Sequence, residues 1–227
     1  MKRIIAGMFT AVLLLTVGGA ARAEEGAGTE VEAGIKWWCN KWKQRSELGT
    51  VRSERSPLIG PAVEAKFHNG IFVEGSYLQS GWDYKFDDAL GTVKLDRRDL
   101  DLAAGYMVLR NVGVFAGYRN SVMKENGTGV KETVYGSLLG VRGSVSLSEA
   151  VSLYGSYTAL LNRFKEEAVE TSRERSPGWA AEAGAKYAFS KHVSASLGVK
   201  YETTKGMATH VRDSFLGWVL GAMYAFE

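Results

Sequence analysis

The side chains best suited to catalysis are few in this chain. Of its three histidines, His68, His192 and His210, only His210 has both a carboxylate and a hydroxyl close by in sequence, in Asp213 and Ser214. A histidine within reach of such groups is the usual general base of a hydrolase. A further acidic segment that would complete such a site contains Asp83, Asp87 and Asp88. The spacing therefore allows a hydrolytic site near His210, although solvated loops explain the same residues.

Other kinds of site have no support in the sequence. Cys39 is the single cysteine, so no internal disulfide forms. No cluster of His, Cys and carboxylates has metal-ligand spacing, and no glycine-rich phosphate loop precedes a helix. We therefore expect a protein that is not an enzyme, with no catalytic residue, no metal and no cofactor.

The first residues have the pattern of an export signal. Lys2 and Arg3 are followed by an uncharged apolar run from 4 to 20 and then by Ala21-Arg22-Ala23. This order predicts a signal peptide at 1–23 that is cleaved after Ala23. A membrane anchor is the alternative, but the apolar run is short for a span. A short segment at 24–30 would then lead into a single domain at 31–227.

The charge balance changes once the signal is removed. The full chain has 28 Lys+Arg and 25 Asp+Glu, a net charge of +3. Lys2, Arg3 and Arg22 account for the excess, so 25 basic residues face 25 acidic ones in the mature chain. A neutral chain gives no reason to expect a nucleic-acid partner.

The mature chain alternates between apolar and polar residues, which is the period of a β-strand. In the segment 31–39, for example, Val31, Ala33, Ile35 and Trp37 alternate with charged or small residues, apart from Trp38. Ten such strands are predicted, at 31–42, 60–67, 71–82, 96–106, 112–121, 132–145, 151–161, 178–189, 193–203 and 213–226. Uncharged runs in this part are too short for a membrane helix of about 20 residues.

The connections between these strands alternate in length. Those at 68–70, 107–111, 146–150 and 190–192 are short, whereas those at 43–59, 83–95, 122–131, 162–177 and 204–212 are long and charged. This alternation predicts an all-β fold, a transmembrane antiparallel up-and-down β-barrel of ten strands. Eight strands are the alternative, if the second or fourth predicted strand is a loop extension.

The aromatic residues of the apolar face fall at two depths, which is typical of the two interfaces of a membrane barrel. The upper belt contains Trp37, Tyr77, Tyr118, Tyr135, Tyr157, Trp179, Tyr201 and Trp218. The lower belt contains Phe67, Tyr106, Tyr187, Tyr224 and Phe226. A soluble barrel would put this face inside, and we expect so narrow a lumen not to bury Trp and Tyr.

The opposite face supplies charges of both signs to the predicted lumen. They are Glu32, Lys36, Glu64, Lys66, Glu74, Asp99, Asp101, Arg119, Arg142, Glu182, Lys186, Lys200 and Glu202. Charges in a narrow interior must be paired or hydrated, because an unpaired buried ion is very costly. The near-equal numbers predict a salt-bridged network, which fits either a plugged structural lumen or a narrow passive-diffusion pore.

The signal, the Gly-x-Tyr pattern at Gly75-Ser76-Tyr77 and Gly155-Ser156-Tyr157, and the last strand ending in Tyr224-Ala225-Phe226 resemble the small bacterial outer-membrane β-barrel superfamily. The resemblance implies a Gram-negative cell envelope and a last strand that is read by the barrel-assembly machinery through its final aromatic residue. This chain departs from the pattern because Glu227 follows Phe226. Some outer-membrane barrels are proteases or lipid-modifying enzymes with sites at the outer rim, but the resemblance is architectural and transfers no active site. We expect a structural or surface-contact role through long extracellular loops.

The first long connection is rich in cations, with Lys41, Lys43, Arg45, Arg52 and Arg55. Such residues suit contact with the outer-membrane lipid, in particular the phosphates of lipopolysaccharide, although plain solvation explains them too.

The tetrapeptide Glu-Arg-Ser-Pro occurs twice, at 54–57 and 174–177, each time in a long connection that leads into a strand. Duplication of a hairpin and shared loop-to-strand chemistry both fit this repeat.

Overall fold

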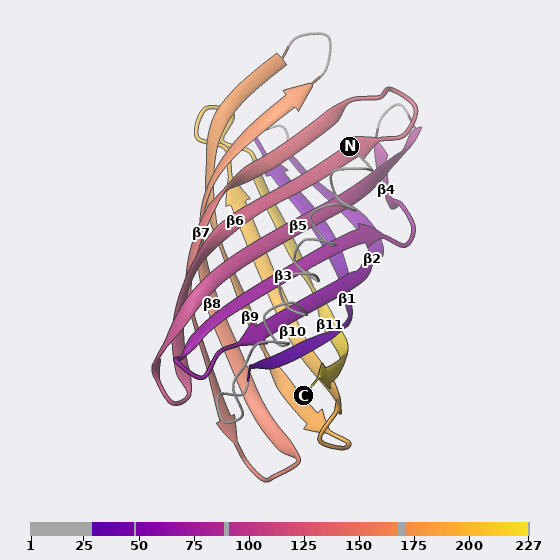
Figure 1. Ribbon diagram of the computed structural model, residues 1–227. Coiled ribbons are helices and arrows are strands. Elements are labelled where there is room, and N and C mark those ends of the chain that lie inside the picture. The colour runs from indigo at the N-terminus through magenta and orange to yellow at the C-terminus, as the bar shows by residue number, and fades with distance from the viewer. Residues whose placement is uncertain (1–28, 48, 89–90, 168–170, 227) are drawn as a thin grey trace.

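The computed structural model describes residues 29–47, 49–88, 91–167 and 171–226. No helix in these ranges is long and apolar enough to cross a bilayer. The predicted signal peptide, with its cleavage site after Ala23, and residues 24–28 lie outside the described residues. The strands are β1 (Glu30–Ser46), β2 (Gly49–Lys66), β3 (Ile71–Ser80), β4 (Tyr84–Asp88), β5 (Gly91–Leu109), β6 (Val112–Glu125), β7 (Lys131–Ser146), β8 (Val151–Glu167), β9 (Thr171–Ala188), β10 (Val193–Lys205) and β11 (Arg212–Phe226) (Figure 1).

The strands form one antiparallel sheet that closes on itself. Consecutive strands pair with one another except β3 and β4, and β1 pairs with β11 from Val31 opposite Phe226 to Arg45 opposite Arg212. The second closing contact is between β3 and β5, which bypasses the short β4. The barrel therefore has ten strands, and β4 is an extra strand that pairs with the upper part of β5.

The eight-stranded alternative is wrong, because the two strands in doubt are full members of the wall. The second predicted strand is β2, with 18 residues, and the fourth is β5, with 19 residues. Both are hydrogen-bonded on either side within the barrel.

The long connections predicted from the sequence are mostly strand, so the prediction of long loops is wrong in extent. β1 and β2 continue to Ser46 and Gly49, and β8 and β9 continue to Glu167 and Thr171. Beyond the apolar part of the wall, both faces of a strand carry polar residues, so the two-residue period disappears from the sequence. The backbone hydrogen bonds nevertheless continue to pair residue by residue. We call this end of the barrel the extended end.

At the opposite end, which we call the turn end, the connections are tight. Between β2 and β3 the amide of Gly70 donates to the carbonyl of Phe67 over 3.0 Å, and the amide of Phe67 donates to Ile71 over 2.8 Å. Gly70 has φ of 85°, in the left-handed region that glycine adopts without steric cost. Short turns at one end and extended hairpins at the other give the molecule its slanted outline (Figure 1).

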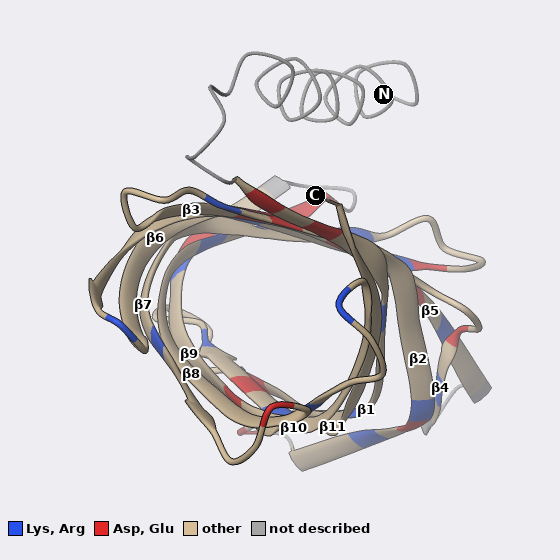
Figure 2. Ribbon diagram, turned by 60° about the horizontal axis from the view of Figure 1, so that its bottom comes forward, with Lys and Arg blue, Asp and Glu red and all other residues tan. Residues whose placement is uncertain are grey.

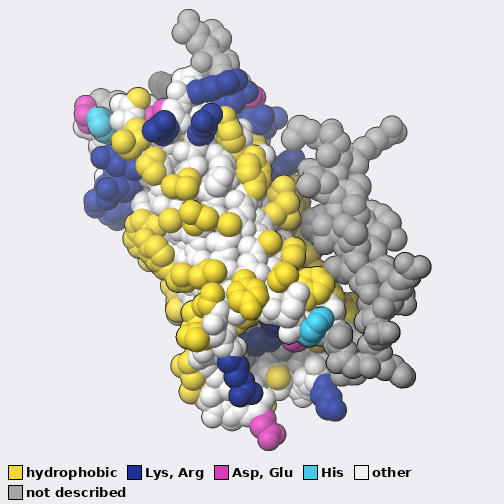
Figure 3. Space-filling view, turned by 60° about the vertical axis from the view of Figure 1, so that its left-hand side comes forward, with side chains coloured by type: hydrophobic (Ala, Val, Ile, Leu, Met, Phe, Trp, Pro, Cys, Tyr) yellow, Lys and Arg dark blue, Asp and Glu magenta, His cyan; other side chains and the backbone are white. Residues whose placement is uncertain are grey.

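The outer face of the wall is apolar over a broad band. Exposed aliphatic and aromatic side chains such as Ile35, Leu139, Leu161 and Leu216 come from alternate strand positions. Figure 3 shows this band between polar ends, with Lys and Arg side chains gathered above it. A band of exposed apolar residues around a closed sheet is expected of a wall that faces lipid.

The interior is more apolar than expected. A first cluster of buried residues fills the part toward the extended end, with Trp38, Trp42, Leu58, Leu78, Tyr84, Leu95, Phe215 and Val219. A second cluster lies closer to the turn end, with Phe72, Ala103, Phe115, Leu138 and Leu160. The expectation that the lumen would not bury Trp and Tyr is therefore wrong.

Inward-facing glycines make room for these rings. A methyl group added at Gly140 would overlap the ring of Phe115, and one added at Gly105 would overlap the ring of Phe72. A narrow barrel can therefore bury a large side chain on one strand because the paired residue on the adjacent strand is a glycine without a side chain.

We predict that Gly140→Ala lowers the free energy of unfolding by about 1–3 kcal/mol, because the added methyl group overpacks Phe115. Urea titration of the refolded protein in lipid vesicles, followed by tryptophan fluorescence, measures the change. The control is Gly155→Ala, where an added methyl group meets only the carbonyl oxygen of Glu182 at 3.7 Å. Equal midpoints for the two variants would contradict the packing argument.

Candidate functional site

The thirteen charged residues assigned to the lumen from the sequence lie on inward positions, and each of them takes part in an ion pair. Toward the turn end, Lys186 lies 2.5 Å from Glu32, and Lys36 lies 3.1 Å from Glu182. Arg142 bridges Glu64 at 2.5 Å and Glu74 at 3.0 Å, and Lys66 lies 3.8 Å from Glu30 and 3.9 Å from Glu64. The partners of Lys36, Lys186 and Arg142 come from strands that are not neighbours in the sheet, so these pairs cross the lumen, whereas Lys66 pairs within β2 and with the adjacent β1. Figure 2, which brings the bottom of the molecule forward, shows charged positions around the ring of strands.

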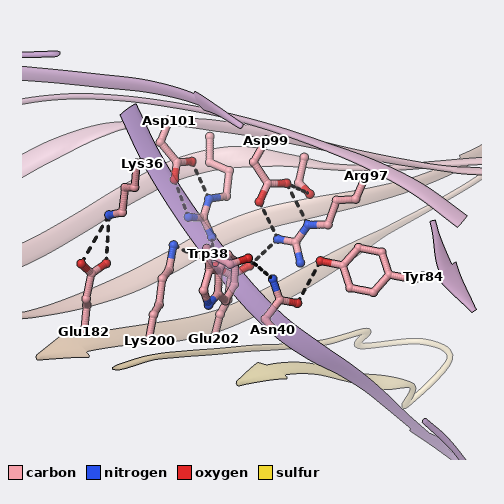
Figure 4. A network of polar contacts seen from close by, with 12 residues as sticks. Lys36, Trp38, Asn40, Tyr84, Arg97, Asp99, Asp101, Glu182, Lys200 and Glu202 are labelled. Atoms are coloured by element: carbon pink, nitrogen blue, oxygen red, sulfur yellow. Dashed lines mark hydrogen bonds and ion pairs between the residues drawn. The ribbon is translucent and has the colours of Figure 1, made fainter. Parts of the chain in front are cut away.

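Midway along the barrel, six charged residues form one connected group, which we call the central charge network. It consists of Arg97, Asp99 and Asp101 on β5, Arg119 on β6, and Lys200 and Glu202 on β10 (Figure 4). Glu202 is its hub, because its carboxylate lies 3.1 Å from Arg97, 2.6 Å from Arg119 and 3.7 Å from Lys200. The network therefore ties the β5–β6 wall to the β10 wall.

The two arginines are held firmly at their other sides. Arg119 donates through Nε and Nη2 to both oxygens of Asp101 at 2.6 Å, a bidentate pair. Arg97 donates through Nε to Asp99 over 2.9 Å, and Ser121 donates to the same carboxylate over 2.6 Å. Bidentate arginine–carboxylate pairs fix geometry as well as contributing energy. The side chains of Arg97 and Arg119 are only 1% and 4% exposed, so the two guanidinium groups are shielded from bulk solvent.

Arg97 was missed in the sequence. It lies two and four residues before Asp99 and Asp101, so the alternation that placed those two carboxylates inside also places Arg97 inside. Its guanidinium carbon lies 3.8 Å from the centre of the Phe215 ring and 5.4 Å from that of Trp38. Such cation–π contacts are strong when both partners are desolvated.

Aromatic side chains cover the central charge network on its extended side. The Lys200 ammonium lies 4.4 Å from the Trp38 ring centre, and Tyr84 donates over 2.9 Å to the amide oxygen of Asn40. Figure 4 shows Trp38 and Asn40 of β1 crossing directly over the network. The lumen is thus closed by two adjoining layers, one charged and one aromatic.

These layers divide the interior into two spaces of very different size. A cavity of about 700 Å³ lies on the turn-end side and reaches up to Asp101, Arg119 and Lys200. A space of about 30 Å³ lies on the other side, against Arg97, Arg119 and Glu202. Arg119 lines both spaces, so a single layer of side chains separates them at that point.

A second charged group lies at the mouth of the extended end and is purely acidic. Asp213 accepts a hydrogen bond of 2.9 Å from Nε1 of Trp42 and one of 3.3 Å from Gln44. Burial raises the pKa of the Asp213 carboxyl despite these hydrogen bonds. Burial, followed by the nearby carboxylates of Asp213, Glu166 and Glu125, raises the pKa of Glu132 to about 7.

The structure does not bring the candidate catalytic residues together. His210 lies in the 206–211 turn with φ of 56°, whereas Asp213 points inward to Trp42. Ser214 contacts Tyr201 and Thr203, and Asp83 accepts a hydrogen bond of 3.0 Å from Asn126. The side chains of Asp87 and Asp88 lie outside the described part of the chain.

The remaining histidines lie at the turn end. His68 is in the β2–β3 turn, and the His192 ring is 3.2 Å from the carbonyl oxygen of Ala225 and stacks on Tyr224. Among the described residues, no three His, Cys, Asp or Glu side chains are gathered in a way that would hold a metal ion.

The aromatic residues of both predicted belts lie on the outer wall, and none of them is buried. In the upper belt, the Trp179 ring centre lies 6.0 Å from that of Tyr157 and 4.9 Å from that of Tyr201. In the lower belt, the ring centres of Tyr224 and Phe226 are 4.9 Å apart. The upper rings of Tyr157, Trp179 and Tyr201 therefore form a row across β8, β9 and β10, whereas the lower pair lies within β11.

We predict that the barrel becomes less stable as the pH rises from about 4.5 to 7. The native state holds a proton on Glu132 more tightly than the unfolded chain does, so stability is greatest below that window and is lost across it. Glu132→Gln should remove a dependence on the order of 2 kcal/mol, measured as urea midpoints at several pH values. Glu47→Gln, at an exposed hairpin position, should keep the wild-type dependence. A wild-type midpoint that is flat or rises over this range would contradict the assignment.

Three solved structures match the chain over most of its length. The outer membrane protease OmpT from Escherichia coli matches with a TM-score of 0.66 and 12% identity, covering 87% of this chain and 97% of its own. Neisserial surface protein A matches with a TM-score of 0.43 and 17% identity, covering 89% and 100%. Ail, the attachment invasion locus protein of Yersinia pestis, matches with a TM-score of 0.41 and 18% identity, covering 86% and 99%. At these identities the likeness to OmpT concerns the fold alone.

No curated protein matches the chain significantly. The family model described as "Outer membrane protein beta-barrel domain" matches residues 9–226, which is nearly the whole chain. Proteins of this family, like the structural neighbours, reside in the bacterial outer membrane. The protein belongs to the outer membrane protein beta-barrel domain family.

Proposed function

We propose that this outer-membrane barrel is non-catalytic, does not conduct through its lumen, and acts in the cell envelope by presenting its extended end at the cell surface. In outer-membrane barrels the short turns face the periplasm and the longer connections face outward. By that rule the turn end is periplasmic and the extended end is extracellular. The role is structural or one of surface contact.

The observation that carries this proposal is the double closure of the lumen. The cavity of about 700 Å³ ends at the central charge network, and the aromatic cluster lies directly beyond it. Opening the charged layer to water would require hydrating charges that now pair with one another. The arrangement therefore favours a plug that is part of the barrel wall itself.

A non-catalytic role is supported by how the rim residues are engaged. Asp213 accepts hydrogen bonds from Trp42 and Gln44. Glu174 accepts hydrogen bonds from Ala208 and Thr209 and so orders the turn that carries His210. A hydrolase would need a histidine held by one acidic partner and aimed at a nucleophile. The described rim residues instead stabilise their own hairpins.

The partners proposed for this role are the outer-membrane lipid, lipopolysaccharide and the barrel-assembly machinery. The exposed apolar band suits lipid, and Phe226 lies at the end of β11 with its ring on the outer wall, 52% exposed. An accessible terminal aromatic is what the assembly machinery would read. Export would depend on cleavage of the signal after Ala23.

We predict that refolded wild-type protein leaves planar bilayers electrically silent at moderate voltage. Single-channel recording at high salt measures this directly, and unheated against heated gel migration shows in parallel that the barrel has folded. Steady unitary currents from folded protein would overturn the closed barrel and favour the narrow pore, which needs only one side-chain layer at Arg119 to move.

We further predict that Glu202→Ala weakens the barrel and makes it leaky. Removing the hub leaves Arg97, Arg119 and Lys200 short of a counter-charge, which should cost about 3–5 kcal/mol of unfolding free energy. The same bilayer assay should show transient openings. Glu30→Ala is the matched control, because Glu30 is 54% exposed and its one ion pair spans 3.8 Å. A Glu202→Ala protein that folds and is as stable and silent as the control would show that the network does not close the lumen.

A further inference from the structure

The outer face of the extended end carries cations directly opposite one another on neighbouring strands. We call this set the basic collar, and its members lie on β1, β2, β8, β9, β10 and β11. The cross-strand pairs are Lys41 with Arg55, Lys43 with Arg52, Arg45 with Arg212, Lys205 with Arg212, Arg163 with Arg175, and Lys165 with Arg173.

Like charges that face each other across a sheet destabilise it. Elsewhere some cations have a carboxylate beside them, since Arg98 on β5 lies 3.1 Å from Asp96, and Lys131, which faces Lys124, lies 3.1 Å from Glu167. The lumen cations named above are all paired. In the collar only Lys165 has such a partner, Glu167. Among the described residues, no carboxylate lies within 4.0 Å of the charged groups of Lys41, Lys43, Arg45, Arg52, Arg55, Arg163, Arg173, Arg175, Lys205 or Arg212.

The pKa of Lys43 shows the effect of the neighbouring collar cations. Partial desolvation, followed by the charges of Arg45 and Arg52, lowers the pKa of Lys43. A surface that concentrates one sign of charge in this way lowers its free energy when an external anion binds between the cations.

The depth of the collar indicates which anion this is. On β9, Arg175 lies four residues beyond Trp179 of the upper belt, and on β1, Lys41 lies four residues beyond Trp37. Four residues of a tilted strand rise by about 10 Å, which carries the collar from the edge of the hydrocarbon layer to the headgroup level. Figure 3 shows Lys and Arg side chains above the apolar band, at the upper end of the wall.

The repeated Glu-Arg-Ser-Pro tetrapeptide builds the same arrangement twice. Ser56 and Ser176 are buried inside the wall, so Arg55 and Arg175 project outward, each two residues above a proline. Beneath Arg175, the Trp179 ring and the rings of Tyr157 and Tyr201 form an apolar shelf. A cationic row above an aromatic shelf matches an amphiphile with phosphates above acyl chains.

We propose that the basic collar binds the phosphate groups of lipopolysaccharide in the outer leaflet, through Arg163, Arg173 and Arg175 on β8–β9 and through Arg45, Lys205 and Arg212 on β10–β11–β1. This proposal rests on the outward orientation of the extended end in the proposed function. The proposal gives the extended end a lipid partner, and the phosphates of that lipid are the counter-ions of the basic collar. The bound phosphates replace the carboxylates that the sheet lacks.

The test compares Arg163→Gln/Arg175→Gln with a charge-matched control, Arg110→Gln/Lys191→Gln, whose residues are exposed at the turn end. Each protein is refolded into phosphatidylcholine nanodiscs and titrated with purified lipopolysaccharide. Wild type and control should bind, and binding should weaken with added salt. The collar variant should bind at least about tenfold more weakly. Dephosphorylated lipopolysaccharide should bind none of the three proteins with high affinity.

Equal binding by the collar variant and the control would overturn the proposal, as would undiminished binding of the dephosphorylated lipid. So would a collar variant that keeps lipopolysaccharide but loses a soluble sulfated glycan. Inorganic phosphate serves as a competitor, and full displacement at millimolar concentration would show an anion site without lipid specificity, which also contradicts the proposal. Gel migration confirms that each variant is folded. If the collar variants contradict the proposed lipopolysaccharide site, the bilayer recordings still test the closed lumen, so the two proposals are judged separately.

Discussion

The structure depends on neutralising Glu202 and its arginine partners inside a barrel too narrow to hydrate them freely. Arg97 and Arg119 reach across from β5 and β6 to a single carboxylate on β10, and each keeps a second carboxylate of its own. This geometry requires the two walls to stand at a fixed separation. The inward glycines, the rings of Trp38 and Phe215 that pack on Arg97, and the strand register all have to agree with that separation. The network therefore sets the cross-section of the barrel as much as it fills it.

The same chain solves two electrostatic problems in opposite ways. Inside, where no external ion can substitute, every lumen charge that the sequence suggested has a partner within the chain, as Lys36 has in Glu182. Outside, above the apolar band, rows such as Lys205, Arg212 and Arg45 have no carboxylate within 4.0 Å in the part of the chain that the structure describes. The lumen charges therefore nearly balance, whereas the outer rim of the extended end carries rows of cations. That local excess of positive charge is the basis for the lipopolysaccharide partner proposed above.

Much of this could be predicted from the sequence, because a wall with one lipid face imposes a strict two-residue period. Ile35, Leu139 and Leu216 fall on one face by counting alone, and Glu32, Lys36 and Glu202 fall on the other. The period does not mark a strand where both of its faces contact water, so the sequence predicts loops where the strands in fact extend to Ser46 and Glu167. It also gives no contact partners. The pairing of Arg97 with Glu202, 105 residues away, and the nesting of Phe115 against Gly140 follow from register and closure, which a single sequence does not encode locally.

The pairing of β1 with β11 has a consequence for how the molecule assembles. Val31 meets Phe226 only when nearly the whole domain is present, and Glu202 meets Arg97 only when the same seam is shut. Backbone closure and charge neutralisation are therefore a single late event, and a half-formed sheet would carry bare strand edges together with uncompensated interior ions. Such an intermediate is poorly tolerated in lipid, so the assembled barrel should open rarely and as a unit. Persistence in the membrane would then be governed by the rate of unfolding and not by the equilibrium alone.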